Sequence, residues 1–152
     1  MVISSDIFNA YLNCPSKCWF CFRNIVATGN MYSQWLETQN QSYRKEALTR
    51  LIDSVDRADC NIAPTQLVST KRAKWQFATD FIVRKDNYES HIHAIERLTL
   101  SGKPDEFIPI RLVSNNKLAK RDKILLAFDS LVLSDAFKHE ISHGKIIYGR
   151  NF

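Results

Sequence analysis

Glycine and proline are scarce in this chain of 152 residues, with four of each. So few turn-forming residues argue against a loop-rich or repetitive fold, and we find no internal repeat and no low-complexity tract. The most apolar stretch, 122–137, contains Lys123, Asp129 and Ser130, so we expect no membrane-spanning helix. The N-terminus has no basic segment followed by a long apolar core. We therefore expect no signal peptide and predict a cytoplasmic protein without a membrane partner.

Cysteine is limited to four residues, and a disulfide framework is not expected in a cytoplasmic chain of this size. Cys14, Cys18 and Cys21 have the spacing with which radical S-adenosylmethionine enzymes hold a four-iron cluster. That chemistry needs a large barrel and a cysteine loop after a first strand, whereas these cysteines follow a predicted amphipathic helix. We therefore interpret them as cysteines on one helix face. Cys60 is too distant and irregularly placed to support a zinc site with them.

The overall composition is that of one folded domain, since 45% of the residues are hydrophobic and 24% are charged. The net charge is +5, and the basic excess is spread over both halves of the chain. The densest basic cluster comprises Lys117, Lys120, Arg121 and Lys123. Such a cluster suits contacts with the phosphates of DNA, and it equally suits a solvated helix end.

Hydrophobic periodicity predicts helices in the first third of the chain. Ser5 and Asp6 are expected to cap a short helix, and Pro15 to begin a second one. The second helix is expected to bury three aromatic residues, Trp19, Phe20 and Phe22. Apolar residues at helical spacing predict a long helix over 33–55, followed by a polar connection over 56–64.

Strands and one apolar helix are predicted for the rest of the chain. Alternating and apolar runs predict strands over 66–68, 76–83, 88–98, 107–113 and 145–149. Pro109 indicates an edge or a bulge in its strand. The apolar stretch 122–137 predicts a helix buried against the sheet. This order of elements predicts an α/β or α+β fold, with a single domain over 1–152.

Histidines form two patterns that resemble metal sites. His139 to His143 matches H-E-x-x-H, but Gly144 and a predicted strand follow at once, so the helix that this motif requires is not expected. His91 and His93 lie two residues apart, on one face of their predicted strand. Two imidazoles so placed can share a metal, and a polar outer face of the sheet explains them without one.

Two regions of the chain carry a resemblance to a known family. The first is 2–17 with 35–46, and the second combines Ala94–Leu98, Ile108–Arg111, Asn116–Leu118, Asp122–Ser134 and Gly144–Gly149. In order and spacing these segments resemble the RecB-like nucleases of the PD-(D/E)XK superfamily, in particular nuclease domains joined to helicase or RNase H-like modules. The resemblance implies a restriction-endonuclease-like fold, a mixed central sheet flanked by helices. It also implies hydrolysis of DNA phosphodiesters with Mg²⁺ or Mn²⁺.

The sequence departs from that family at the positions that would hold the metal. Glu46 is the acidic residue available on the long helix, and it lies two positions after Arg44. His93 matches the aspartate of the family, and Pro109-x-Arg111 matches its E-x-K pair. Mg²⁺ prefers hard oxygen ligands, and arginine cannot act as a base near neutral pH. We therefore expect an eroded site with Glu46, His93 and Arg111 at the remnant catalytic positions.

Three functions stay open at this point. The leading hypothesis is a non-catalytic protein that binds DNA or other nucleic acid through Lys117, Lys120, Arg121 and Lys123, or binds a protein partner such as a helicase. The first alternative is an active Mg²⁺- or Mn²⁺-dependent nuclease with Glu46 and His93 as metal ligands and Glu96 and Asp105 as further available groups. The second is a structural subunit of a helicase or nuclease assembly, with Trp19, Trp35 and Trp75 as candidate anchors. We expect no cofactor in the leading case. An iron–sulfur cluster is not expected either, because Cys14 alone matches the cysteines that hold one in related nucleases.

Overall fold

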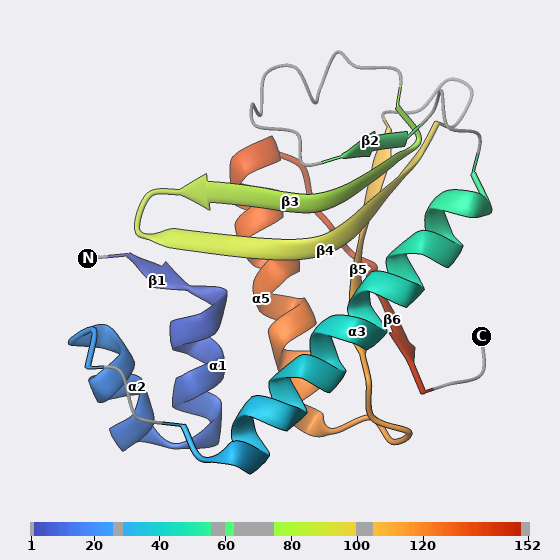
Figure 1. Cartoon of the computed structure of the whole chain (residues 1–152). Coiled ribbons are helices and arrows are strands. Elements are labelled where there is room, and N and C mark those ends of the chain that lie inside the picture. The colour runs from blue at the N-terminus through green and yellow to red at the C-terminus, as the bar shows by residue number, and fades with distance from the viewer. Residues whose placement is uncertain (1, 26–28, 56–59, 63–74, 100–104, 150–152) are drawn as a thin grey trace.

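A mixed sheet forms the centre of the molecule, with six strands in the part of the chain that the structure describes (Figure 1). The computed structural model of the chain describes residues 2–25, 29–55, 60–62, 75–99 and 105–149. The strands are β1 (Ile3–Ser4), β2 (Cys60–Ile62), β3 (Phe77–Lys85), β4 (Tyr88–Leu98), β5 (Glu106–Val113) and β6 (Lys145–Tyr148). Their order is β2-β3-β4-β5-β6, and β1 pairs with the beginning of β4. The three central strands, β3 to β5, are antiparallel, whereas β1, β2 and β6 run parallel to their neighbours.

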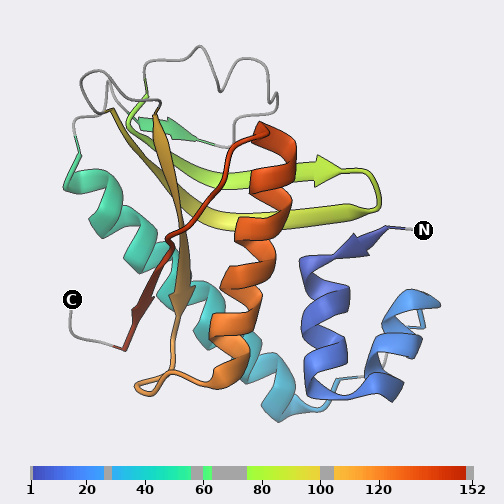
Figure 2. The same cartoon turned by 180° about the vertical axis from the view of Figure 1, so that it is seen from behind.

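Helices cover both faces of this sheet. The helices of the described residues are α1 (Ser5–Asn13), α2 (Pro15–Phe22), α3 (Met31–Asp53) and α5 (Lys120–Phe137), and all but α2 contact the sheet. In Figure 1, α3 crosses the face of the sheet that is turned to the viewer. In Figure 2, seen from behind, α5 crosses the opposite face and α1 lies beside it. The expectation of a mixed α/β fold whose sheet is flanked by helices is confirmed.

Two hydrophobic cores hold the helices to the sheet. On the α5 face, Leu133 and Phe128 are buried with Phe81 and Ile92 of the sheet. Burial of such a side chain stabilises the fold by about 1.5–3 kcal/mol. On the α3 face the core is smaller, and Ala47 is the residue of α3 that it buries. The apolar character of the 122–137 stretch therefore reflects its burial, as the sequence predicts.

The two halves of strand β5 pair with different strands, on opposite edges of β5. Its first half, up to Ile110, pairs with β4, and its second half, from Ile110 to Val113, pairs with β6. Pro109 lies in the first half, which β6 does not reach, so its missing N–H group costs no pairing with β6. On the same side of β4, β1 pairs with Tyr88 and Glu89. Residues 90–93 of β4 are thus left in a gap between β1 and β5.

Several boundaries differ from the sequence predictions. The N-cap of α1 is Ser4, whose Oγ accepts from the Ile7 N–H group at 3.2 Å, and Ser5 is buried instead. The stretch expected to be a polar connection includes β2. The strand predicted over 66–68 lies outside the described residues. None of the helices in the described ranges combines the length and hydrophobicity that crossing a bilayer requires.

The prediction that α2 buries its aromatic residues is wrong. Trp19, Phe20 and Phe22 are 52%, 45% and 45% exposed, and α2 has no buried residue. The helix packs on α1, which stands between it and α5 (Figure 2). Periodicity correctly predicts the helix, but it does not reveal whether another layer covers the apolar face.

Candidate functional site

A hollow of about 280 Å³ opens where β4 and β5 separate, between α1, α3 and α5. Three arginines line it, Arg44 from α3, Arg111 from β5 and Arg121 from α5, and we call it the arginine hollow. Its other lining residues include His93 and a group of amides and acids, Asn9, Glu37, Asn40, Gln41, Asn115 and Asp122. The hollow therefore joins positively charged groups from both faces of the sheet at one place.

His93 lies in the gap between β1 and β5, and its ring accepts a hydrogen bond there in place of a neighbouring strand. The Nδ1 atom accepts a 2.9 Å hydrogen bond from the backbone N–H group of Leu112. Burial lowers the pKa of His93 well below its ordinary value, and Arg44, Arg111 and His91 lower it further. An Nδ1 atom that accepts a hydrogen bond carries no proton, so His93 is a neutral imidazole with its proton on Nε2.

Arg111 is held by a buried carboxylate on the opposite helix. Its guanidinium donates three hydrogen bonds of 2.7–3.0 Å to Asp129 of α5, which is 1% exposed. The Ser90 hydroxyl donates to the same carboxylate at 2.5 Å, and Ser5 donates to Ser90 at 3.2 Å. The backbone N–H of His91 in turn donates to Ser5 at 3.0 Å. Burial raises the pKa of Asp129, while Arg111 and Ser90 oppose that rise. These contacts fix Arg111 in one orientation.

Arg44 is paired with a strained residue of β3. Its Nη2 atom donates to Oδ1 of Asp80 at 2.7 Å, and it lies 3.4 Å from Nε2 of His91. Asp80 has a φ of 51°, in the left-handed region, and the pairing of β3 with β4 passes over it between Thr79 and Phe81. Such interruptions are common beside functional sites, because they turn a side chain out of the regular alternation of the strand.

Arg121, the third arginine of the hollow, is held differently from Arg44 and Arg111. Its Nη1 atom donates to the side-chain oxygen of Asn13, and its buried Nε atom has no hydrogen-bond partner among the described residues. It forms no ion pair within that part of the chain. The neighbouring Asp122, which also lines the hollow, accepts from the N–H group of Ala119 at the helix terminus at 2.9 Å.

The structure brings together two of the three predicted remnant residues. His93 and Arg111 both line the arginine hollow, with Arg44 beside them. Glu46 does not join them. Its side chain is 62% exposed and pairs with Arg50 at 2.5 Å, in a second hollow on the other side of α3. The position on α3 that faces the site is therefore Arg44, two residues earlier.

The other predicted residues are distributed around the molecule. Of the basic cluster, Arg121 lines the arginine hollow, while Lys117 and Lys120 are exposed and do not line it. Lys123 lines a different hollow, and the acids of the active-nuclease alternative are engaged elsewhere, Glu96 with Lys145 and Asp105 with Arg97. Basic residues that lie close together in the sequence thus line two different hollows.

The hydrogen bonds that connect Arg111 with Asp129, Ser90 and Ser5 were not predicted from the sequence. One signal was present, because Asp129 interrupts an otherwise apolar stretch, and a carboxylate on a buried helix face needs a partner. Ser5 and Ser90 gave no such signal, since serine is common at helix starts and in strands. The H-E-x-x-H pattern has no structural support, because 139–143 is not helical. Within the described residues, no three side chains of His, Cys, Asp or Glu form a group suited to hold a metal ion.

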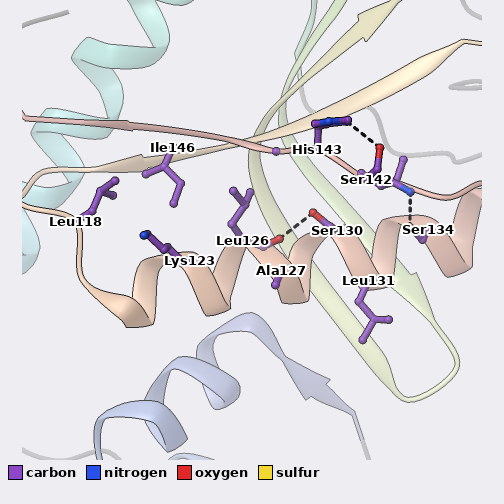
Figure 3. A pocket seen from close by; sticks show the side chains of 12 residues that line it. Leu118, Lys123, Leu126, Ala127, Ser130, Leu131, Ser134, Ser142, His143 and Ile146 are labelled. Carbon is purple, nitrogen blue, oxygen red and sulfur yellow. Dashed lines mark hydrogen bonds between the residues drawn. The ribbon is translucent and has the colours of Figure 1, made fainter.

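Another hollow, with a volume of about 680 Å³, lies between α5 and β6. Figure 3 shows its lining, mainly apolar residues such as Leu126 and Ile146, with Lys123 at one end. It gathers no group of charged side chains, so the smaller arginine hollow is the candidate site. No protein-family model matches this chain, and no curated protein matches it. The chemistry of the arginine hollow is therefore the basis for a functional assignment.

Proposed function

We propose that this chain has a restriction-endonuclease-like fold without nuclease activity, and that it binds the phosphate backbone of nucleic acid at the arginine hollow. The mixed sheet flanked by helices is consistent with the fold that the resemblance to RecB-like nucleases implies. The observation that carries the proposal is the convergence of Arg44, His93 and Arg111 at one hollow. The resemblance implies acidic metal ligands at His93 and at or near Arg44, and a lysine at Arg111. Here the first two positions hold a neutral and a cationic side chain.

The carboxylates around the hollow are already engaged, which argues against a metal-dependent reaction there. Of the carboxylates that line it, Asp122 accepts from the Ala119 N–H group and Glu37 from the Gln41 amide, while behind it Asp80 pairs with Arg44 and Asp129 with Arg111. A divalent cation prefers several free oxygen ligands, and at this place it would meet guanidinium groups. The neutral His93 does not supply the missing oxygen ligand. The chemistry of these donors favours an anion as the ligand.

The start of α5 provides the groups that a phosphate would contact. Arg121 forms no ion pair with a carboxylate of the described residues, and Lys117 and Lys120 are exposed near it in the sequence. The positive end of the α5 dipole adds to this charge. Guanidinium groups bind phosphate oxygens in a bidentate manner, and several such contacts make binding strongly dependent on salt.

Salt-dependent binding to an oligonucleotide tests the proposal. Fluorescence anisotropy with labelled single strands and duplexes is expected to show log K falling linearly with log salt concentration. Arg121→Gln is expected to weaken binding and to lower the slope by about 0.7–0.9, the value for one phosphate contact.

Lys123→Gln is the matched control for that variant. It removes the same charge from the same helix turn, but its side chain lines the hollow between α5 and β6. A slope close to that of the unchanged protein is expected. Binding that does not respond to salt, or no binding to either form of nucleic acid, would overturn the proposal and favour a protein partner.

A further inference from the structure

The first half of α3 presents an aromatic surface to solvent. Every residue over 31–42 is exposed, and Tyr32 and Trp35 are 68% and 56% exposed. Their rings lie nearly parallel, at an interplanar angle of 28° with centroids 6.0 Å apart. Large aromatic side chains at such exposure lose the stabilisation that burial would give them. A helix that keeps two of them exposed side by side therefore indicates a binding surface.

This surface is continuous with the arginine hollow. Leu36, the residue after Trp35, lines the arginine hollow. Trp35 itself lines the hollow on the other side of α3, of about 590 Å³, which we call the tryptophan hollow. Leu36, Ser114 and Asn115 line both hollows. A ligand can therefore contact Trp35 and the arginines without leaving the surface of the protein.

The polar groups around the aromatic pair have the character of a nucleobase site. Amide side chains surround it, with Gln39 and Asn115 in the tryptophan hollow and Asn40 and Gln41 in the arginine hollow. Amides offer a donor and an acceptor together, which matches the edges of bases. A partner protein of apolar chemistry would require a continuous apolar patch, and here the amides interrupt it.

We infer that Tyr32 and Trp35 form a stacking platform for unpaired nucleobases, whose backbone phosphates lie at the arginine hollow. This inference rests on the proposed function, because the phosphates bring the bases to α3. Bases in a duplex are stacked on each other and cannot reach an aromatic face, so the platform selects single-stranded nucleic acid. The aromatic face accepts any base, and the site has little sequence preference.

Three probes separate stacking from charge: a labelled single-stranded oligonucleotide, an abasic oligonucleotide with the same number of phosphates, and the matching duplex. The single strand is expected to bind most tightly. Trp35→Ala is expected to weaken its binding by about 5- to 150-fold, the range for one stacked base, and to leave the abasic affinity unchanged. Trp35→Phe keeps an aromatic face and is expected to retain most of the affinity.

Trp19→Ala is the matched control, since Trp19 is a tryptophan of similar exposure on α2 that lines neither hollow. Equal effects of Trp19→Ala and Trp35→Ala, or equal affinity for the single strand and the abasic probe, would overturn the platform. In that case Arg121→Gln would still weaken the binding of all three probes, and the proposed function would stand. If no probe binds, the proposed function fails and the platform with it. A dimer that sedimentation shows to depend on Trp35, without oligonucleotide binding, would instead make this surface a protein interface.

Discussion

The Nδ1 atom of His93 accepts a 2.9 Å hydrogen bond from the backbone N–H group of Leu112. This bond crosses the gap where β4 has stopped pairing with β5, after the pair Ala94–Ile110. A buried backbone N–H group without a partner would destabilise the fold, so the imidazole replaces the acceptor that the ladder no longer supplies. His93 therefore has a structural role that explains its presence in β4 without any metal.

Because folding lowers the pKa of His93, we predict that its contribution makes stability fall as the pH falls below 6.5. Above that value both the folded and the unfolded chain carry a neutral imidazole, so this residue causes no pH dependence. Between pH 6.5 and the lowered pKa of the folded state, His93 is protonated in the unfolded chain but stays neutral in the folded protein. The expected loss is about 1.36 kcal/mol per pH unit in that window. Urea unfolding at a series of pH values measures it.

His93→Asn is the control, since its side-chain oxygen can accept from Leu112 but does not titrate. The difference in unfolding free energy between the two proteins should narrow as the pH falls from 7 towards 5, because only His93 loses stability there. Other titrating groups contribute equally to both proteins. Parallel curves would show that His93 titrates alike in the folded and unfolded states.

Arg111 and Asp129 are predicted to be strongly coupled in stability. Asp129 is 1% exposed and the Arg111 side chain 11%, so either single change leaves a buried charge without its partner. Arg111→Met and Asp129→Leu are each expected to cost about 3–5 kcal/mol, and the double variant less than either single one. Urea unfolding of all four proteins gives the coupling free energy.

The exposed pair of Arg84 and Glu89 offers a comparison for that cycle. The Arg84 side chain is 62% exposed, so Arg84→Met is expected to change stability by no more than about 1 kcal/mol. Additive losses at Arg111 and Asp129 would mean that their hydrogen bonds do not hold the orientation of Arg111. The guanidinium group of Arg111 would then have no fixed position in the arginine hollow.

The sequence predicts the elements of this fold better than it predicts the site. Long periodic segments such as 88–98 and 122–137 are found as predicted, since periods of two and 3.6 residues follow directly from strand and helix geometry. The pairing of Asp129 with Arg111 joins residues of β5 and α5 across the sheet face, and no local pattern reveals it. Arg44 faces the hollow and Glu46 does not, because two residues along an α-helix differ by about 200° in direction around its axis. The sequence does not reveal which of these directions faces the site. The exposure of Trp19 depends on which layers the tertiary structure builds.

We predict that the chain does not cut DNA. Incubation of supercoiled plasmid with the protein and Mg²⁺ or Mn²⁺ should produce no nicked or linear form above the level with metal alone. The reason is the set of carboxylates at and behind the hollow. Asp80 and Asp129 pair with arginines, Glu37 and Asp122 already accept hydrogen bonds, and Glu46 faces another hollow. Cleavage that Glu46→Ala or His93→Ala abolishes would establish the rearranged nuclease instead. Cleavage that survives both changes would mean that a metal site lies away from the arginine hollow, and either result would contradict a non-catalytic role.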